Sequence, residues 1–152
     1  MLLDNFLPQK EGFMETTVIR LDLPAEHKHL NVIGACLNAL LERIDRISDK
    51  EMLAYNLELA LHETCTNIVE HAYFEREGRI QVAMSVIDFP QRQFVIDVHD
   101  TGAAFDLTKA EEPDLEGAQV HGYGLFLMRQ LLDEVVYQSG EVSNHWHLVK
   151  NI

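Results

Sequence analysis

The chain has 152 residues, of which 47% are hydrophobic and 24% charged, and this length fits one domain around one hydrophobic core. The composition excludes a disordered chain. The formal net charge of -13 argues against nonspecific binding to nucleic acid, which needs many Lys and Arg side chains on phosphates, and favours a protein partner or a small ligand.

Targeting signals and cysteine usage bear on where the protein works. The N-terminus lacks a basic stretch followed by an apolar one, and no run approaches the roughly 20 apolar residues of a membrane span. Cys36 and Cys65 do not form the cysteine framework of a secreted domain, and we interpret them as reduced core thiols. We therefore expect a cytoplasmic protein that does not bind membranes.

The first half of the chain predicts a strand followed by two helices. Residues 1–13 lack periodicity and are expected to form an N-terminal extension to a domain that spans residues 14–152. Thr17–Leu23 has the pattern of a strand. Apolar residues then recur at helical spacing over two stretches, Leu30–Ile47 and Lys50–Ala72.

The second half predicts two hairpins on either side of a loop and a helix. The expected elements are strands 79–87 and 91–98 joined by a turn at 88–90, a mobile loop over 107–119, a helix beyond Gly124, and strands 134–138 and 145–150. This order predicts an α+β fold: a two-layer sandwich of a mostly antiparallel, mixed sheet with helices on one face.

A first group of polar residues follows one side of the second predicted helix. Glu63, Asn67 and His71 are spaced four residues apart, so helical rotation places them in one row. An Asn oxygen suits Mg²⁺, and a carboxylate one turn away can deprotonate a hydroxyl that attacks a phosphate. The alternative is a solvated polar stripe on a helix surface.

A second candidate lies at the end of a predicted strand. Alternation places Asp100 on the same face as Phe94, Ile96 and Val98, so its carboxylate needs hydrogen-bond donors. The exocyclic amino group of adenine is one candidate, and Gly102 would let backbone approach the ring. The alternative is a plain strand-ending turn over residues 100–102.

A third candidate begins the last predicted helix. In Gly122-Tyr123-Gly124-Leu125, two glycines lie where the free amides of a helix N-terminus point outward, which is an anion-binding arrangement. The alternative is a pair of glycines that allow tight packing.

These three segments together resemble the motifs of GHKL ATPases, the superfamily of gyrase, MutL and sensor histidine kinases. Residues 58–73 resemble the N-box, residues 100–106 resemble the G1 box in its anti-sigma-kinase form, and residues 122–135 resemble the G2 segment of anti-sigma-factor serine kinases. The three motifs occur in the family's order on the expected elements. The resemblance covers nearly all of the chain from Met14 onward.

The resemblance implies a Bergerat-type fold that binds Mg²⁺-ATP. Asn67 would bind the metal and Glu63 would act as the catalytic base. The resemblance also implies the following nucleotide contacts: Asp100 and Gly102 at adenine, Gly122 and Gly124 at the phosphates, and His71, Phe105, Tyr123 and Leu125 elsewhere in the site. Residues 107–121 would form a short lid whose one basic residue is Lys109.

Family membership also implies partners. In this family the phosphate acceptor is a serine or threonine of an anti-anti-sigma (STAS-type) protein, the kinase alternatively holds a sigma factor inactive, and homodimers are common. Two other hypotheses remain: a nucleotide-binding regulatory module that binds partners without transferring phosphate, and a domain of a larger histidine kinase, for which 13 residues leave no room for a phospho-accepting helix.

Zinc hydrolase chemistry is not predicted. His62-Glu63 begins a metalloprotease-like motif, but Thr66 stands where the second histidine would be. His71, His99 and His121 are scattered over different predicted elements, which favours surface or supporting roles over metal ligation.

Overall fold

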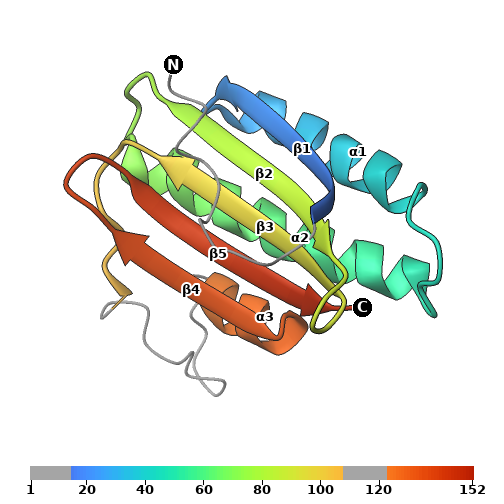
Figure 1. Cartoon of the computed structure of the whole chain (residues 1–152). Helices are drawn as coiled ribbons and strands as arrows, with labels where there is room; N and C mark the ends of the chain where they lie inside the picture. The colour runs from blue at the N-terminus through green and yellow to red at the C-terminus, as the bar shows by residue number, and fades with distance from the viewer. Residues whose placement is uncertain (1–14, 108–122) are drawn as a thin grey trace.

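The computed structural model describes residues 15–107 and 123–152, and these form two layers (Figure 1). The strands are β1 (Glu15–Pro24), β2 (Arg79–Ile87), β3 (Gln93–Asp100), β4 (Glu134–Ser139) and β5 (Asn144–Asn151). The helices are α1 (Leu30–Leu41), α2 (Lys50–Asn67) and α3 (Tyr123–Leu131), with a 3₁₀ turn η1 (His27–His29) and a π-helical turn η2 (Ile68–Ala72).

The sheet has the strand order β1-β2-β3-β5-β4, and the three helices cover one of its faces (Figure 1). This confirms the predicted α+β sandwich. All four pairings among the described strands are antiparallel, so within the described residues the sheet is antiparallel rather than mixed.

The core lies between the sheet and the helices. Side chains alternate along a strand, and on β3 the fully buried members are Phe94, Ile96 and Val98, as the sequence pattern predicted. Trp146 and Leu148 extend this apolar face onto β5. Asp100 continues the same face and is 3% exposed, so this carboxylate enters the layer of the core.

Helix α1 ends at Leu41, and the prediction of a helix up to Ile47 was wrong. Arg46 adopts a left-handed backbone with a φ of 59°. The Arg92 guanidinium donates hydrogen bonds to the carbonyls of Asp45 and Arg46 at 2.7 and 3.2 Å. Ile44 still reaches the core at 7% exposure, so packing and these long-range hydrogen bonds override the helical spacing.

The second predicted helix divides into two parts. Asp49 caps the start of α2, since its Oδ1 accepts a hydrogen bond from the Met52 amide at 2.9 Å. The α-helical hydrogen bonding stops at Asn67, and the wider turn η2 follows at once. Such π-helical turns occur often at functional sites because they change the direction of the side chains that follow.

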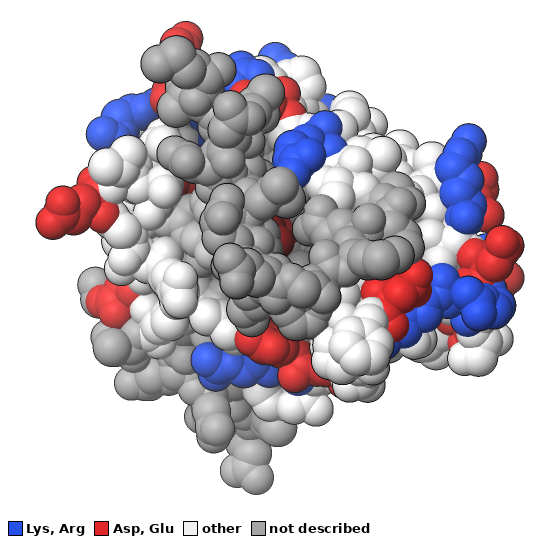
Figure 2. All heavy atoms as spheres, in the orientation of Figure 1, with Lys and Arg blue, Asp and Glu red and all other residues white. Residues whose placement is uncertain are grey.

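The surface and the termini complete the description. Among the described residues, no helix is both long and apolar enough to cross a membrane. Figure 2 shows acidic and basic side chains of the described residues interspersed on the face in view. The expected extension over residues 1–13 and most of the expected lid lie outside the described residues.

Candidate active site

Glu63 and Asn67 lie on the last turns of α2, where α3 begins beside them. Both side chains are partly exposed. A Cβ placed on Gly124 would lie 2.7 Å from Glu63 Oε2 and 3.9 Å from Asn67 Nδ2. The first turn of α3 therefore contacts both polar side chains, and the glycine leaves room for the carboxylate. The N-terminus of α3, where the positive end of the helix dipole lies, is brought to the same place.

Asp100 ends β3 with a carboxylate held by protein donors. Its Oδ1 accepts hydrogen bonds from the Gly102 amide and from Asn144 Nδ2, both at 2.9 Å. Burial raises the pKa of Asp100, and the hydrogen bonds from Asn144 and Gly102 lower it by less, so the net pKa is raised. A carboxylate has about four acceptor positions, so one with two donors on one oxygen retains acceptor capacity.

Gly102 packs against the backbone of η2. A Cβ at this position would lie 2.5 Å from the Ala72 carbonyl oxygen and 2.6 Å from its carbonyl carbon. The next amide, that of Ala103, donates a hydrogen bond to the same oxygen at 2.7 Å. The space that a side chain at this position would need is taken by the turn after Asn67, and the approach of a ligand ring to the Gly102 backbone stays a prediction.

A small hollow joins the predicted residues across α2, η2 and the sheet. Its lining includes Asn67, His71, Asp100 and Phe105 together with Tyr137 and Trp146, and its volume is about 10 Å³. This is about the space of one water molecule. The Phe105 ring lies 5.5 Å from Trp146, 6.0 Å from Tyr137 and 6.2 Å from His71, measured between ring centroids. The hollow is therefore bordered by a packed aromatic cluster.

Two residues that line this hollow, Tyr137 and Trp146, and the neighbouring Asn144 were missed by the sequence reasoning. Asn144 fixes Asp100, and its Nδ2 also donates to the Gly102 carbonyl at 3.0 Å. The Tyr137 hydroxyl accepts a hydrogen bond from the Phe105 amide at 2.6 Å, and Trp146 also lines the hollow. Alternation on β5 places Asn144 on the face of Trp146 and Leu148, the same signal that identified Asp100.

The remaining residues predicted for the site lie at or before the start of α3. Leu125 is 6% exposed and its side chain belongs to the core, so any contact with a nucleotide would come from its backbone. Tyr123 begins α3 and is partly exposed. Gly122 and Lys109 lie outside the described residues.

A larger hollow of about 1090 Å³ lies elsewhere, between the end of β1 and the turn after η2. Its lining includes Glu26, His27, Glu70, Glu75 and Arg76. It contains neither Glu63 nor Asp100, and its carboxylates would repel an anionic ligand. The convergence of carboxylate, carboxamide and helix N-terminus, rather than volume, identifies the candidate site.

A family model described as the histidine kinase-like ATPase domain matches residues 23–150. The chain belongs to this family. The match therefore includes every described residue of the candidate site, from Glu63 on α2 to Trp146 on β5.

Relatives within the family are serine-protein kinases named RsbW. The protein of Bacillus velezensis is 32% identical over 137 residues, which cover 83% of this chain and 82% of the relative. The protein of Bacillus subtilis is 30% identical over 130 residues, covering 80% and 78%. The chain is thus a member of the RsbW-like branch of kinases and anti-sigma regulators.

Solved structures support the fold. A histidine kinase domain from the blue-light activated histidine kinase of Erythrobacter litoralis superposes with a TM-score of 0.52 at 21% identity. The alignment covers 82% of this chain and 59% of that one. A second structure of this kinase gives a TM-score of 0.54, with 41% of its chain covered. This chain therefore spans less than two thirds of either solved chain, and at this identity the likeness concerns the fold alone.

Proposed function

We propose that the protein is an ATP-dependent serine/threonine-protein kinase that acts as a partner-switching anti-sigma factor. Its substrate would be a serine or threonine of an anti-anti-sigma, STAS-type protein, and its second partner a sigma factor. The proposed location is the cytoplasm, because the reaction uses ATP as phosphate donor. The observation that carries the proposal is the meeting of Glu63 and Asn67 with the first turn of α3 at Gly124.

The donors in the site fit ATP and Mg²⁺. The oxygen of Asn67 is a hard, neutral ligand of the kind Mg²⁺ takes, and the backbone amides and dipole at the start of α3 suit phosphate oxygens. Asp100 would accept a hydrogen bond from the adenine amino group, beside the two that it receives from Gly102 and Asn144. The hollow of about 10 Å³ has to widen for the ring, and Phe105 borders it.

Each group in the site would have a defined part in phosphoryl transfer. Mg²⁺ supplies charge neutralisation on the phosphate oxygens when bound. Glu63 would accept the proton of the attacking serine hydroxyl as its oxygen bonds to the γ-phosphorus. The bond from that phosphorus to the bridging oxygen breaks, and ADP leaves. The amides of α3 would stabilise the charge that collects on the transferred group.

The decisive experiment separates binding from transfer. Calorimetric titration with ATP, with and without Mg²⁺, measures binding, and labelled γ-phosphate measures transfer to a STAS-type protein. We expect Glu63→Gln to retain ATP affinity and to abolish transfer. Glu58→Gln is the matched control, because it makes the same change on an exposed turn of α2. Transfer that persists in Glu63→Gln would remove the assigned base.

The same data test the alternative of a regulatory module that binds partners without chemistry. Micromolar, Mg²⁺-dependent binding together with transfer supports the kinase. Binding without transfer in the wild-type protein, with a competent substrate from a related system, would favour the module instead.

A further inference from the structure

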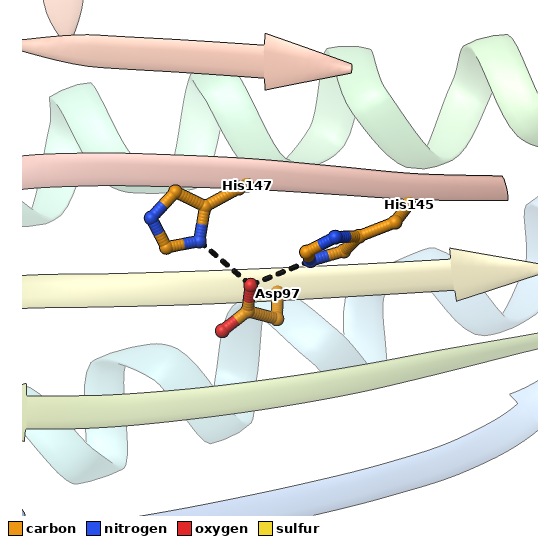
Figure 3. Close-up of side chains that lie close together, drawn as sticks. All are labelled: Asp97, His145 and His147. Atoms are coloured by element: carbon orange, nitrogen blue, oxygen red, sulfur yellow. Dashed lines mark hydrogen bonds and ion pairs between the residues drawn. The ribbon is translucent and has the colours of Figure 1, made fainter. Parts of the chain in front are cut away.

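Three side chains converge on the sheet face opposite the helices, away from the candidate active site. Asp97 comes from β3, and His145 and His147 come from β5 (Figure 3). Asp97 Oδ1 lies 2.6 Å from His145 Nε2 and 2.7 Å from His147 Nδ1. One ligand atom from each residue lies within 4.8 Å of those of the other two. The three groups thus point at one another rather than into solvent.

The pairing of two adjacent strands of the sheet produces this convergence. Asp97 is directly opposite His147 in the antiparallel pair β3–β5, and His145 lies two residues from His147 on the same face. His99, opposite His145, stacks on its ring with centroids 4.2 Å apart and planes 6° from parallel. Backbone pairing and ring stacking therefore hold the groups on a rigid element, which favours a defined site.

Burial and charge distinguish this cluster from a chance surface grouping. Asp97 is 6% exposed, whereas the two histidine side chains are each 29% exposed. Burial alone would raise the pKa of Asp97, but the hydrogen bonds from His145 and His147 outweigh it and lower that pKa to about 2. The cluster therefore combines a buried negative charge with two imidazoles that solvent can reach.

We propose that Asp97, His145 and His147 form a binding site for a divalent transition metal ion, with Zn²⁺ as the ion that the donors fit best. Two imidazole nitrogens and one carboxylate oxygen are a ligand set that Zn²⁺ uses, leaving a fourth position for water. The inference is independent of the kinase proposal, because it uses the other face of the sheet.

The geometry requires a small adjustment. Ligand atoms of a tetrahedral zinc ion with bonds of about 2.0–2.1 Å lie about 3.3 Å apart. The two present N···O separations of 2.6 and 2.7 Å would widen by about 0.6–0.7 Å. Each histidine would carry its proton on the ring nitrogen that faces away from Asp97, so neutral imidazoles become ligands by a change of tautomer.

The test is metal titration of the full-length, untagged protein. We expect ZnCl₂ to bind with one high-affinity equivalent per chain, and CoCl₂ to give the visible absorption bands of a low-symmetry, four-coordinate site. His145→Gln and His147→Gln should each weaken Zn²⁺ binding by at least about a hundredfold, because losing even an outer-shell partner costs 10–100-fold. His62→Gln, an exposed histidine on α2, is the matched control.

Two results would overturn the site. One is the absence of a tight equivalent of Zn²⁺ in the wild-type protein, and the other is unchanged affinity in both glutamine variants. If circular dichroism shows that a variant does not fold, NMR on the wild-type protein decides the question. Zn²⁺ should then shift the ring NMR signals of His145 and His147 but not that of His62, and the reverse pattern would exclude the assignment.

Discussion

Asp100 is a residue at which stability and the proposed function make opposite demands. Its carboxylate is buried, and its raised pKa means that the folded protein binds a proton there more tightly than the unfolded chain does. The resulting loss of stability is absent at acidic pH, where the group is protonated in both states. It develops as the pH rises past the ordinary carboxylate pKa and is complete above the raised one.

We therefore predict that Asp100→Asn raises the melting temperature at pH 7 and leaves it nearly unchanged in acid. The amide oxygen can still accept from Gly102 and Asn144, so the hydrogen bonds survive without the buried charge. ATP affinity should fall by about 1.5–3 kcal/mol, the value of a hydrogen bond to a charged group. Thermal unfolding across pH and calorimetric ATP titration measure the two effects. A lower melting temperature at pH 7 would show that the charge itself is needed for folding.

Gly124 is a residue where a small side chain would disturb chemistry more than stability. A Cβ would lie 2.7 Å from Glu63 Oε2, which is the end of a flexible side chain and can move aside. Alanine also favours the helix by up to about 1 kcal/mol. We predict that Gly124→Ala changes the free energy of unfolding by less than about 1 kcal/mol. Phosphoryl transfer should fall about ten- to a hundredfold, because displacing a catalytic group by 1 Å has this effect.

Urea denaturation and a transfer assay on the same preparation check this prediction. Full transfer activity in a stable Gly124→Ala protein would show that the present position of Glu63 is not the one used in catalysis.

At the scale of elements, the end of β3 and the turn η2 are locked together by Gly102. Here a Cβ would meet the backbone of Ala72 at 2.5 Å, and the backbone cannot move aside as a side chain does. We predict that Gly102→Ala lowers the free energy of unfolding by about 1–3 kcal/mol, the usual cost of overpacking. The measurement is urea denaturation with Gly124→Ala as the comparison. If the two variants unfold with equal free energies, η2 can move away from the added Cβ at little cost, and the predicted overpacking is wrong.

The secondary-structure elements also show which features the sequence patterns could predict and which they could not. Period-two alternation correctly predicted the buried face of β3, including Asp100, because sheet pairing preserves it. Helical spacing failed beyond Leu41, because hydrogen bonds from Arg92, distant in the chain, stabilise a non-helical path through Arg46. The pair His145 and His147, spaced two apart on one strand, was a readable signal, but its partner Asp97 becomes visible only once β3 and β5 are paired.

At the scale of the molecule, the order of the elements and the three motifs predicted the fold and the family, and both are confirmed. Motif order is informative because each motif lies at an element boundary: Asn67 at the end of α2, Asp100 at the end of β3 and Gly124 at the start of α3. Tyr137 and Trp146, whose side chains complete the hollow, lie outside the three motifs and were therefore not predicted. The N-terminal extension and a homodimer stay predictions of the sequence.

The whole molecule should respond to nucleotide as one cooperative unit, because the site joins α2, α3 and the sheet. A ligand at a hundred times its dissociation constant stabilises the folded state by about 2.7 kcal/mol. For a domain of this size, each kcal/mol raises the melting temperature by about 2–4 °C. We therefore predict a rise of about 5–11 °C with Mg²⁺-ATP at that concentration, measured by differential scanning calorimetry.

Controls have to separate this effect from general screening, since added cations reduce the self-repulsion of a chain with a net charge of -13. Mg²⁺ without nucleotide, and NaCl at equal ionic strength, give that baseline. Asn67→Ala should lose most of the ATP-dependent rise while keeping the baseline, because the carboxamide is the proposed metal ligand and the residue is partly exposed. If the melting temperature of Asn67→Ala still rises with ATP at all Mg²⁺ concentrations, other residues must bind the metal. The catalytic role of Glu63 would then have to be reassigned as well.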